Sequence, residues 1–376
     1  MTAISPIASA EILVTPAATE AARRICVLSE DLSGAPDEGV KKFALALADS
    51  LGRRHSVTLV STRGAAPRPG ARLASAPRTF LSRALRRELR QIQPEVVIYV
   101  ARSSATFLTF LRCRALKAFC PGATLALIGL QERRHGIWER RLIPFLHPDV
   151  VCVQSAESKA YLEGLGCHVA LLPSGVDTDT YRPIPQEARN ALRARYGLES
   201  DRPVALHVGH LRAGRGVHAL ADLAARGDCQ VLLVTSSSTA HEAEPGLADE
   251  LRGAGVILKS EYLPRIEELY QLADCYVFPV ASTDNCIGVP LSVLEAFACD
   301  LPVVSRRFAA LPELFADRAE EYPGLVFVDS PQALVDEALR LCRAGVRGTR
   351  PLALPYGWDA IAAAVLDHAL KERVRA

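Results

Sequence analysis

Short runs of apolar, β-branched residues alternate along the chain with stretches in which apolar residues recur at helical spacing. The first run, residues 23–29, is followed by an amphipathic pattern over residues 38–54. The apolar positions that share one face of this expected helix are Phe43, Leu45, Leu47 and Leu51. Further strand-like runs occupy residues 55–61, 94–100, 123–129, 149–155, 202–209, 229–236, 255–260, 274–280 and 301–305.

This alternation predicts an α/β protein. Continuous apolar strands separated by helices are typical of parallel sheets that are covered on both faces. A second series of strands begins at residue 202, after a segment rich in proline and charge, so we expect two doubly wound, Rossmann-like domains. The expected divisions are a flexible leader (1–22), an N-terminal domain (23–182), a hinge (183–200), a C-terminal domain (201–354) and a C-terminal helix crossing back to the N-terminal domain (355–376).

Composition narrows the class of protein. The 376 residues are 49% hydrophobic, which is enough for two cores, and the formal net charge of +2 gives no whole-chain argument for nucleic-acid binding. Ten cysteines are scattered without a CxxC pair, mostly in apolar runs, as expected for small buried residues in a reducing compartment. With no secretory signal and no apolar run of about 18 residues, we expect a cytoplasmic protein.

The turn after the strand at residues 202–209 is the first candidate for chemistry. It reads "HVGHLRAGRGVHAL", and ligands of open α/β sheets bind beyond the carboxyl ends of the strands. Glycines at 209, 214 and 216 allow backbone N–H groups to approach an anion, while His210, Arg212 and Arg215 supply donors. A pyrophosphate suits this turn; a flexible loop with solvated arginines is the alternative.

A second candidate turn leads into the helix "PLSVLEAFACD". Pro290 stands in its first turn, and we expect the N–H groups near Gly288 and Val289 to be free to bind a ligand. Glu295 lies within this helix. It is either a solvated, dipole-compensating carboxylate or an acceptor of hydrogen bonds from two adjacent hydroxyls, such as those of a ribose.

These segments together resemble a known family, the retaining nucleotide-sugar glycosyltransferases of family 4, or group 1, which have the GT-B fold. The resemblance rests on "LLPSGVDTDTYRP", "VGHLRAGRGV", "LYQLADCYVFPV", "IGVPLSVLEAFACDLPVVS" and "YGWDAIAAAVLDHAL". It implies two domains facing across a cleft, no cofactor and no metal. The family's two diphosphate-binding basic residues fall on His210 and Arg215, and its E-x7-E motif falls on Ile287 and Glu295. The donor-binding residues expected on this basis are Gly39, Gly209, Arg212, Gly216, Tyr262, Asn285, Ile287, Gly288, Val289 and Glu295, with Arg215, Glu295 and His210 as the catalytic set.

Ile287 departs from the family pattern. The acid expected there would contact hydroxyls of the transferred sugar, and an isoleucine side chain accepts no hydrogen bond. Three interpretations follow: the donor sugar lacks or blocks a hydroxyl, Asp284 or Asn285 takes over the contact, or transfer activity is reduced. His210 replaces an arginine, which makes the phosphate site pH-dependent.

The N-terminal half is expected to bind the acceptor, which is a small molecule, a glycan or a lipid-linked sugar. The resemblance implies that Gly39 lies in a glycine loop facing the donor phosphate, and that Gln131 or His135 lies near the sugar. His135 is equally well explained as a surface loop residue. The acids Asp177 and Asp179 imitate a metal-binding pair but lie in an interdomain turn, where aspartate caps.

The basic helix at residues 83–90 allows two interpretations. Its arginines could contact an anionic membrane weakly, or they could be the solvated face of a helix packed on a sheet, which we favour. The sequence therefore predicts a cytoplasmic, retaining, metal-independent glycosyltransferase. The alternatives are a binding or scaffold protein with reduced activity, and a nucleotide-sugar epimerase or hydrolase, for which no convincing acid/base pair is present.

Overall fold

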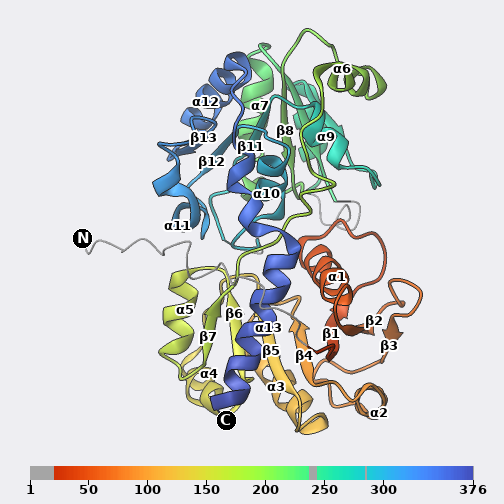
Figure 1. Cartoon of the computed structure of the whole chain (residues 1–376). Helices are drawn as coiled ribbons and strands as arrows, with labels where there is room; N and C mark the ends of the chain where they lie inside the picture. The colour runs from red at the N-terminus through yellow and green to blue at the C-terminus, as the bar shows by residue number, and fades with distance from the viewer. Residues whose placement is uncertain (1–20, 237–243, 284–285, 376) are drawn as a thin grey trace. The chain divides into compact units, whose positions relative to one another are not determined.

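A computed structural model describes residues 21–236, 244–283 and 286–375. Their contacts form two compact units. The N-terminal unit contains residues 21–174, 286–289 and 358–375, and the C-terminal unit contains residues 175–236, 244–283 and 290–357. In Figure 1 each unit has one sheet with helices around it. Neither unit is continuous in sequence. The predicted domain limits and hinge stay predictions.

The N-terminal unit is built on a seven-stranded sheet with the order β3-β2-β1-β4-β5-β6-β7, and all of its pairings are parallel. The strands are β1 (Arg24–Asp31), β2 (Ser56–Arg63), β3 (Arg72–Leu73), β4 (Val96–Val100), β5 (Thr124–Gly129), β6 (Val150–Val153) and β7 (Val169–Leu171). The helices are α1 (Gly39–Gly52), α2 (Arg83–Ile92), α3 (Phe107–Phe119), α4 (Ile137–Leu142), the 3-10 turn η2 (Ile143–Phe145), α5 (Ala156–Glu163) and α13 (Trp358–Arg375).

Two helix layers cover this sheet. Cys26 and Leu28 of β1 belong to a core cluster with Leu85 of α2 and Phe110 of α3. Side chains alternate along a strand, so the neighbouring apolar residues of β1 face the other side. Helices α1 and α13 contact each other, α1 packs on β1 and β2, and α13 packs on β5 and β6. The C-terminal helix thus belongs to the N-terminal unit.

The C-terminal unit has a six-stranded parallel sheet with the order β10-β9-β8-β11-β12-β13. The strands are β8 (Val204–Val208), β9 (Gln230–Val234), β10 (Val256–Lys259), β11 (Cys275–Phe278), β12 (Val303–Arg306) and β13 (Leu325–Val328). The helices are α6 (Gln186–Arg195), α7 (His218–Ala225), α8 (Leu247–Gly253), α9 (Glu267–Leu272), α10 (Leu291–Ala298), α11 (Leu311–Phe315) and α12 (Pro331–Ala344). The 3-10 turns are η3 (Ala213–Arg215), η5 (Ala316–Arg318), η6 (Arg350–Leu352) and η7 (Leu354–Tyr356).

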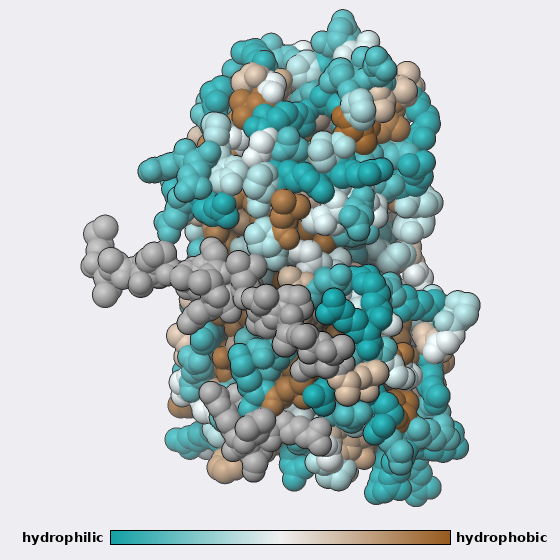
Figure 2. Space-filling model, in the orientation of Figure 1, coloured by the Kyte–Doolittle hydropathy of each residue, from teal (hydrophilic) through white to brown (hydrophobic). Residues whose placement is uncertain are grey.

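Helices α7, α8 and α12 share one core cluster with this sheet, and α9 and α10 contact strands of the same sheet. The prediction of two doubly wound parallel sheets is therefore confirmed. In the described part of the chain, no helix has the length and apolarity needed to cross a membrane. The face of the molecule in Figure 2 is mostly hydrophilic, with hydrophobic residues in small groups.

Candidate functional site

The strand order of the C-terminal sheet reverses between β8 and β11, because β8 connects onward to β9 on one side and β11 to β12 on the other. In open parallel sheets such a reversal leaves a crevice at the carboxyl ends of the two strands, where ligands bind. The glycine-rich turn at residues 209–216 follows β8, and Pro279 follows β11. The turn singled out by its sequence therefore stands at the switch point.

Two glycines allow this turn to pack closely against Pro279 and His207. Gly216 has φ of +71°, and a Cβ there would lie 2.5 Å from the carbonyl oxygen of Pro279. A Cβ at Gly209 would lie 2.6 Å from Nε2 of His207. Larger residues would force the turn away from β11 or displace the buried imidazole. Gly209 and Gly216 thus shape the turn, and the contacts with a donor predicted for them stay predictions.

His207 was missed by the sequence analysis, because it is embedded in the apolar strand "VALHV". Its side chain is buried, and its Nδ1 lies 2.9 Å from the carbonyl oxygen of Val277, which gives it the geometry of an N–H donor. Burial, with smaller contributions from the nearby charges of Arg215 and His210, lowers the pKa of His207 to about 4, although the hydrogen bond to Val277 opposes this shift. The predicted phosphate-binding residues Arg215 and His210 therefore lie around one neutral imidazole under the turn.

We expect acidification from pH 6.5 to pH 4 to destabilise the C-terminal unit through His207. The folded-state pKa is about 4 and the ordinary value is 6.5, so between these values the unfolded chain binds a proton that the folded chain does not. Stability contributed by the neutral imidazole is present above pH 6.5 and is lost as the pH falls to 4. Urea unfolding across this range should show a flatter pH dependence in His207→Phe, whereas exposed His168→Gln should behave as wild type. An unchanged slope in His207→Phe would contradict the assignment.

Glu295 of α10 is 4% exposed. It lies close to the Tyr270 hydroxyl, whose pKa is raised by burial and then by the Glu295 carboxylate. Tyr270 stacks on Tyr276 with ring centroids 5.8 Å apart, and the Tyr276 hydroxyl donates to the carbonyl of Val208 at 3.2 Å. An aromatic layer thus connects Glu295 with the end of β8, where the glycine turn begins. The predicted contact of Glu295 with ribose stays a prediction.

The N–H groups of Gly288 and Val289 are not free, so the prediction that they are available to a ligand is wrong in this structure. Gly288 donates to the carbonyl of Leu130 at 2.8 Å, and Val289 donates to Oε1 of Gln154 at 2.8 Å. Ser174 also donates to the Val289 carbonyl at 2.6 Å and accepts from Gln154 at 2.9 Å. Pro290 has an extended backbone and directly precedes α10. Residues 286–289 belong to the N-terminal unit, and the amides of Gly288 and Val289 are hydrogen-bonded within that unit.

Ile287 is 9% exposed and packs against the first residue of α1. A Cβ at Gly39 would lie 3.3 Å from Cδ1 of Ile287, so the glycine leaves room for this apolar contact. Lys41 fixes the loop ahead of Gly39, because its Nζ donates to the carbonyls of Ser33 at 2.5 Å and Ala35 at 3.1 Å. Gly39 and Ile287, predicted from distant parts of the sequence, are thus in contact. Their roles toward a donor stay predictions.

His135 is buried, so the interpretation of it as a surface loop residue is wrong, and its predicted contact with the acceptor stays a prediction. Its Nε2 lies 2.8 Å from the carbonyl oxygen of Ala105, and its Nδ1 lies 3.1 Å from the hydroxyl of Tyr161. Both ring nitrogens are therefore occupied, and burial lowers the pKa of the imidazole. Gln131 follows Leu130 directly and so lies beside the Gly288 contact. Its binding role stays a prediction.

The remaining predicted residues are dispersed. Tyr262 lies after β10 and is 44% exposed, and Arg212 directly precedes η3; their contacts with a donor stay predictions. Asn285 and Asp284 lie outside the described residues. Asp177 caps its own turn, accepting from the backbone N–H groups of Asp179 and Thr180 at 3.1 Å, as the capping interpretation predicted. No cluster of three potential metal ligands occurs among the residues that the structure describes.

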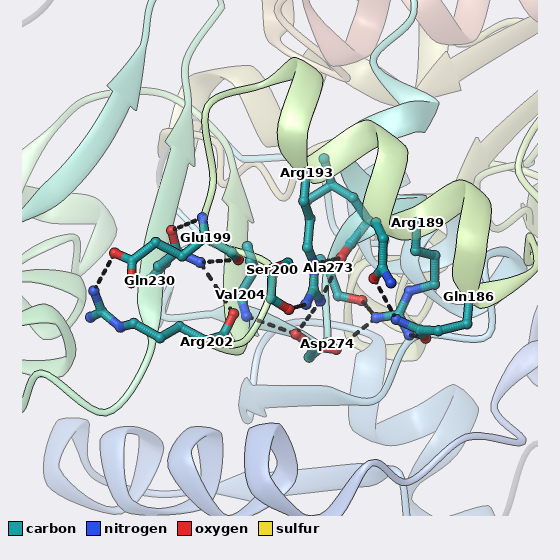
Figure 3. A network of polar contacts seen from close by, with 12 residues as sticks. Gln186, Arg189, Arg193, Glu199, Ser200, Arg202, Val204, Gln230, Ala273 and Asp274 are labelled. Atoms are coloured by element: carbon teal, nitrogen blue, oxygen red, sulfur yellow. Dashed lines mark hydrogen bonds and ion pairs between the residues drawn. The ribbon is translucent and has the colours of Figure 1, made fainter.

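An ionic network fixes the opposite ends of β8 and β11, where these two central strands begin, and Figure 3 shows its residues. Asp274 precedes β11, and its two carboxylate oxygens accept from Arg189 at 2.6 Å and from Arg193 at 2.5 Å. Its Oδ2 also accepts from the backbone N–H of Val204 at 2.8 Å. The network binds α6 to the starts of β8 and β11, the two strands whose ends carry the candidate site. The sequence indicated that α6 is a charged segment, but it did not indicate that its arginines bind Asp274.

Known glycosyltransferases are similar to parts of this chain. Residues 202–344 match the model of the glycosyl transferases group 1. A GDP-mannose-dependent alpha-(1-6)-phosphatidylinositol monomannoside mannosyltransferase of Mycolicibacterium smegmatis is 30% identical over 234 residues, which cover 53% of this chain and 60% of the relative. The lipopolysaccharide core biosynthesis mannosyltransferase LpsB of Rhizobium meliloti is 26% identical over 65% of this chain and 68% of the relative.

A solved structure of Anabaena HepE in complex with UDP matches 94% of this chain and 99% of its own, with a TM-score of 0.68 and 16% identity. At this identity the likeness shows the fold. The alignment with the M. smegmatis enzyme reaches 60% of that enzyme's length. The chain therefore has the two-domain GT-B fold, and its residues 202–344 are similar to the group 1 glycosyl transferases, the family that the sequence resembles.

Proposed function

We propose that this protein transfers a glycosyl unit from a nucleotide-sugar donor to an acceptor hydroxyl. The observation that carries the proposal is the glycine turn at the β8–β11 switch point, with Arg215 and His210 around it. Packing of the sheet alone does not require a turn that combines glycine with arginine. A bound diphosphate does, because it needs backbone N–H groups to approach closely and positive side chains nearby. The turn lies within the region that matches the family model.

The main chemical task in this proposal is to stabilise the departing diphosphate. Arg215 is always charged and can form two parallel hydrogen bonds with phosphate oxygens. His210 adds a donor whose charge depends on pH. We infer that the configuration of the sugar is retained without a protein base, because the departing diphosphate can take up the acceptor proton on the same face. No metal is invoked, because the basic side chains supply the compensating charge.

The names of the relatives guide the choice of ligands. The M. smegmatis enzyme is named for GDP-mannose and a phosphatidylinositol acceptor, and HepE was solved with UDP. We therefore propose a GDP- or UDP-sugar as the donor, and a glycan, a lipid-linked sugar or a small polyol as the acceptor. None of the ten cysteines, all of which lie among the described residues, forms a disulfide bond, and nine are buried, which favours a reducing compartment such as the cytoplasm.

A transfer assay tests this proposal. Purified protein is incubated with UDP-, GDP- and ADP-sugars, each with glycan, inositol-phosphate and glycolipid acceptors, and nucleoside diphosphate release is followed. Release that requires both donor and acceptor is expected for at least one pair. Acceptor-independent release with free sugar as the product would indicate a hydrolase, and isomerisation of the donor sugar would indicate an epimerase.

Ile287 favours a second candidate function, a nucleotide-sugar-binding protein with little transfer activity. Its apolar side chain lies beside Gly39, at the position where the family pattern has a carboxylate. Such a protein would be stabilised thermally by a nucleotide sugar but would release no nucleoside diphosphate with any acceptor. Binding with turnover, in contrast, supports the transferase.

Ile287→Glu is expected to change the choice of donor. A buried hydroxyl without a partner costs about 1–3 kcal/mol, so the wild type should discriminate about tenfold or more against fully hydroxylated hexose donors. A carboxylate at position 287 would restore an acceptor, near the start of α1, where the helix dipole favours negative charge. The measurement is donor competition in wild type, Ile287→Glu and the size-matched Ile287→Leu. Equal preference in all three proteins would rule out a sugar contact at position 287.

A further inference from the structure

A short segment of the N-terminal unit presents large apolar side chains to solvent. The exposed fractions are 68% for Ile137, 71% for Trp138, 50% for Leu142 and 78% for Phe145. These residues belong to α4 and η2, and no residue of α4 is buried. We call these four residues, with Arg140 and Arg141, the α4 surface. Apolar side chains of this size gathered in one exposed segment commonly mark an interaction site.

The underside of the segment is firmly attached to the unit. Ile143, between Leu142 and Phe145 in sequence, is fully buried. Nε of Arg140 donates to the carbonyl of His135 at 2.9 Å, and the buried His135 ring is itself held by Ala105 and Tyr161. Figure 1 shows α4 beside α5, and Arg134 pairs with Glu157 of α5. The apolar side chains are therefore presented outward by an anchored backbone.

The charge of the α4 surface is positive. Neither Arg140 nor Arg141 forms an ion pair with a carboxylate in the described part of the chain, whereas Arg134 does so with Glu157. The guanidinium of Arg141 lies over the ring of Trp138, 5.1 Å from its centroid. Glu139, the acid within α4, turns back to accept from the N–H of Gly136 at 2.7 Å. Exposed tryptophan and phenylalanine are thus combined with arginine.

We propose that the α4 surface docks on an anionic lipid bilayer. Tryptophan is enriched at the boundary between lipid headgroups and acyl chains. Each nearby arginine is attracted by the negative surface potential of an anionic bilayer, which strengthens binding. The basic helix α2, the site first considered for membrane contact, lacks an apolar face for this purpose because Leu85 and Leu89 are fully buried. The inference goes beyond the proposed transfer reaction and does not depend on it.

Tryptophan fluorescence provides a direct test. The chain has two tryptophans, and Trp358 is buried against Phe43, with ring centroids 5.2 Å apart. In a Trp358→Phe protein, therefore, emission comes from Trp138. We expect vesicles with about one third phosphatidylglycerol to shift this emission to the blue, and pure phosphatidylcholine vesicles to shift it much less. Lipids brominated near the headgroup should quench it.

Matched variants identify the surface. In the Trp358→Phe background, Phe145→Asn and Arg141→Glu should each weaken binding to the anionic vesicles about tenfold or more. Controls of the same chemistry are Leu354→Asn, which changes another exposed apolar residue, and Arg87→Glu on α2, and both should bind as the parent protein. Circular dichroism verifies that each variant is folded.

Three results would overturn the proposal. One is the absence of any emission shift with anionic vesicles. Another is emission that is already blue without vesicles and shifts with protein concentration, because Trp138 would then be covered by a second copy of the chain. Loss of binding in the two control variants to the same extent would also exclude the α4 surface as the docking site.

Discussion

Asp274→Ala is expected to lower the free energy of unfolding of the C-terminal unit by about 3–5 kcal/mol, the range for breaking a buried ion pair from one side. Asp274 accepts from Arg189, from Arg193 and from the N–H of Val204. The side chain of Arg193 is 5% exposed, so its charge would be left without its carboxylate and with little access to water. The first residues of the adjacent strands β8 and β11 would also lose the carboxylate that links them.

Urea unfolding followed by far-ultraviolet circular dichroism measures this change. Both tryptophans lie in the N-terminal unit, so their fluorescence reports on that unit separately. The matched control is Asp336→Ala, which breaks an exposed ion pair with Arg226 whose N–O distance is 3.6 Å, and it should cost less than about 1 kcal/mol. An Asp274→Ala protein as stable as this control would show that the network contributes no net stability.

Arg215→Ala is expected to lower kcat/KM for glycosyl transfer by about 100- to 1000-fold, the cost of removing one preorganised donor to developing charge. Arg215 lies in η3, in the turn that Gly216 holds against Pro279. Binding of free nucleoside diphosphate should weaken by about 1.5–3 kcal/mol, the value of a hydrogen bond to a charged group. Catalysis is affected more than binding because charge on the diphosphate increases as the sugar departs.

Arg215→Lys and Arg226→Ala control for this prediction. Lysine keeps the charge but loses the planar pair of donors, so it should recover part of the activity. Arg226 caps the far end of α7, away from the turn, and its removal should leave transfer unchanged. Loss of transfer with unaltered diphosphate binding in Arg215→Ala would place Arg215 on another part of the reaction.

The sequence predicted the fold because each main strand is an apolar run with a helix after it. It also predicted the turn at 209–216, since glycine and arginine there interrupt a regular pattern. The short strands β3, β7 and β13 were not predicted; β3 has two residues and both are exposed, so it carries little apolar signal. Local patterns thus identify strands that bury side chains.

What the sequence could not give depends on contacts between distant residues. His135 is buried by Ala105 and Tyr161, and neither partner stands near it in the chain. The amides of Gly288 and Val289 are paired with Leu130 and Gln154, more than a hundred residues away.

In the sequence, His207 cannot be distinguished from the other core residues of β8. Its role becomes clear from the hydrogen bond between its ring and the carbonyl of Val277. Similarly, Glu30 and Arg112 form a buried ion pair in the N-terminal unit, and the Tyr99 hydroxyl donates to Glu30 at 2.8 Å. Each partner stands in an ordinary apolar segment.

The central claim is that the β8–β11 switch point binds the diphosphate of a nucleotide sugar. Calorimetric titration of wild type and Arg215→Ala with UDP, GDP and ADP tests it most directly, because it requires no knowledge of the acceptor. We expect at least one of these ligands to bind to one site per chain, and the substitution to weaken this binding about tenfold or more. Equal affinity in the two proteins, or no binding of any of the three to the wild type, would contradict it.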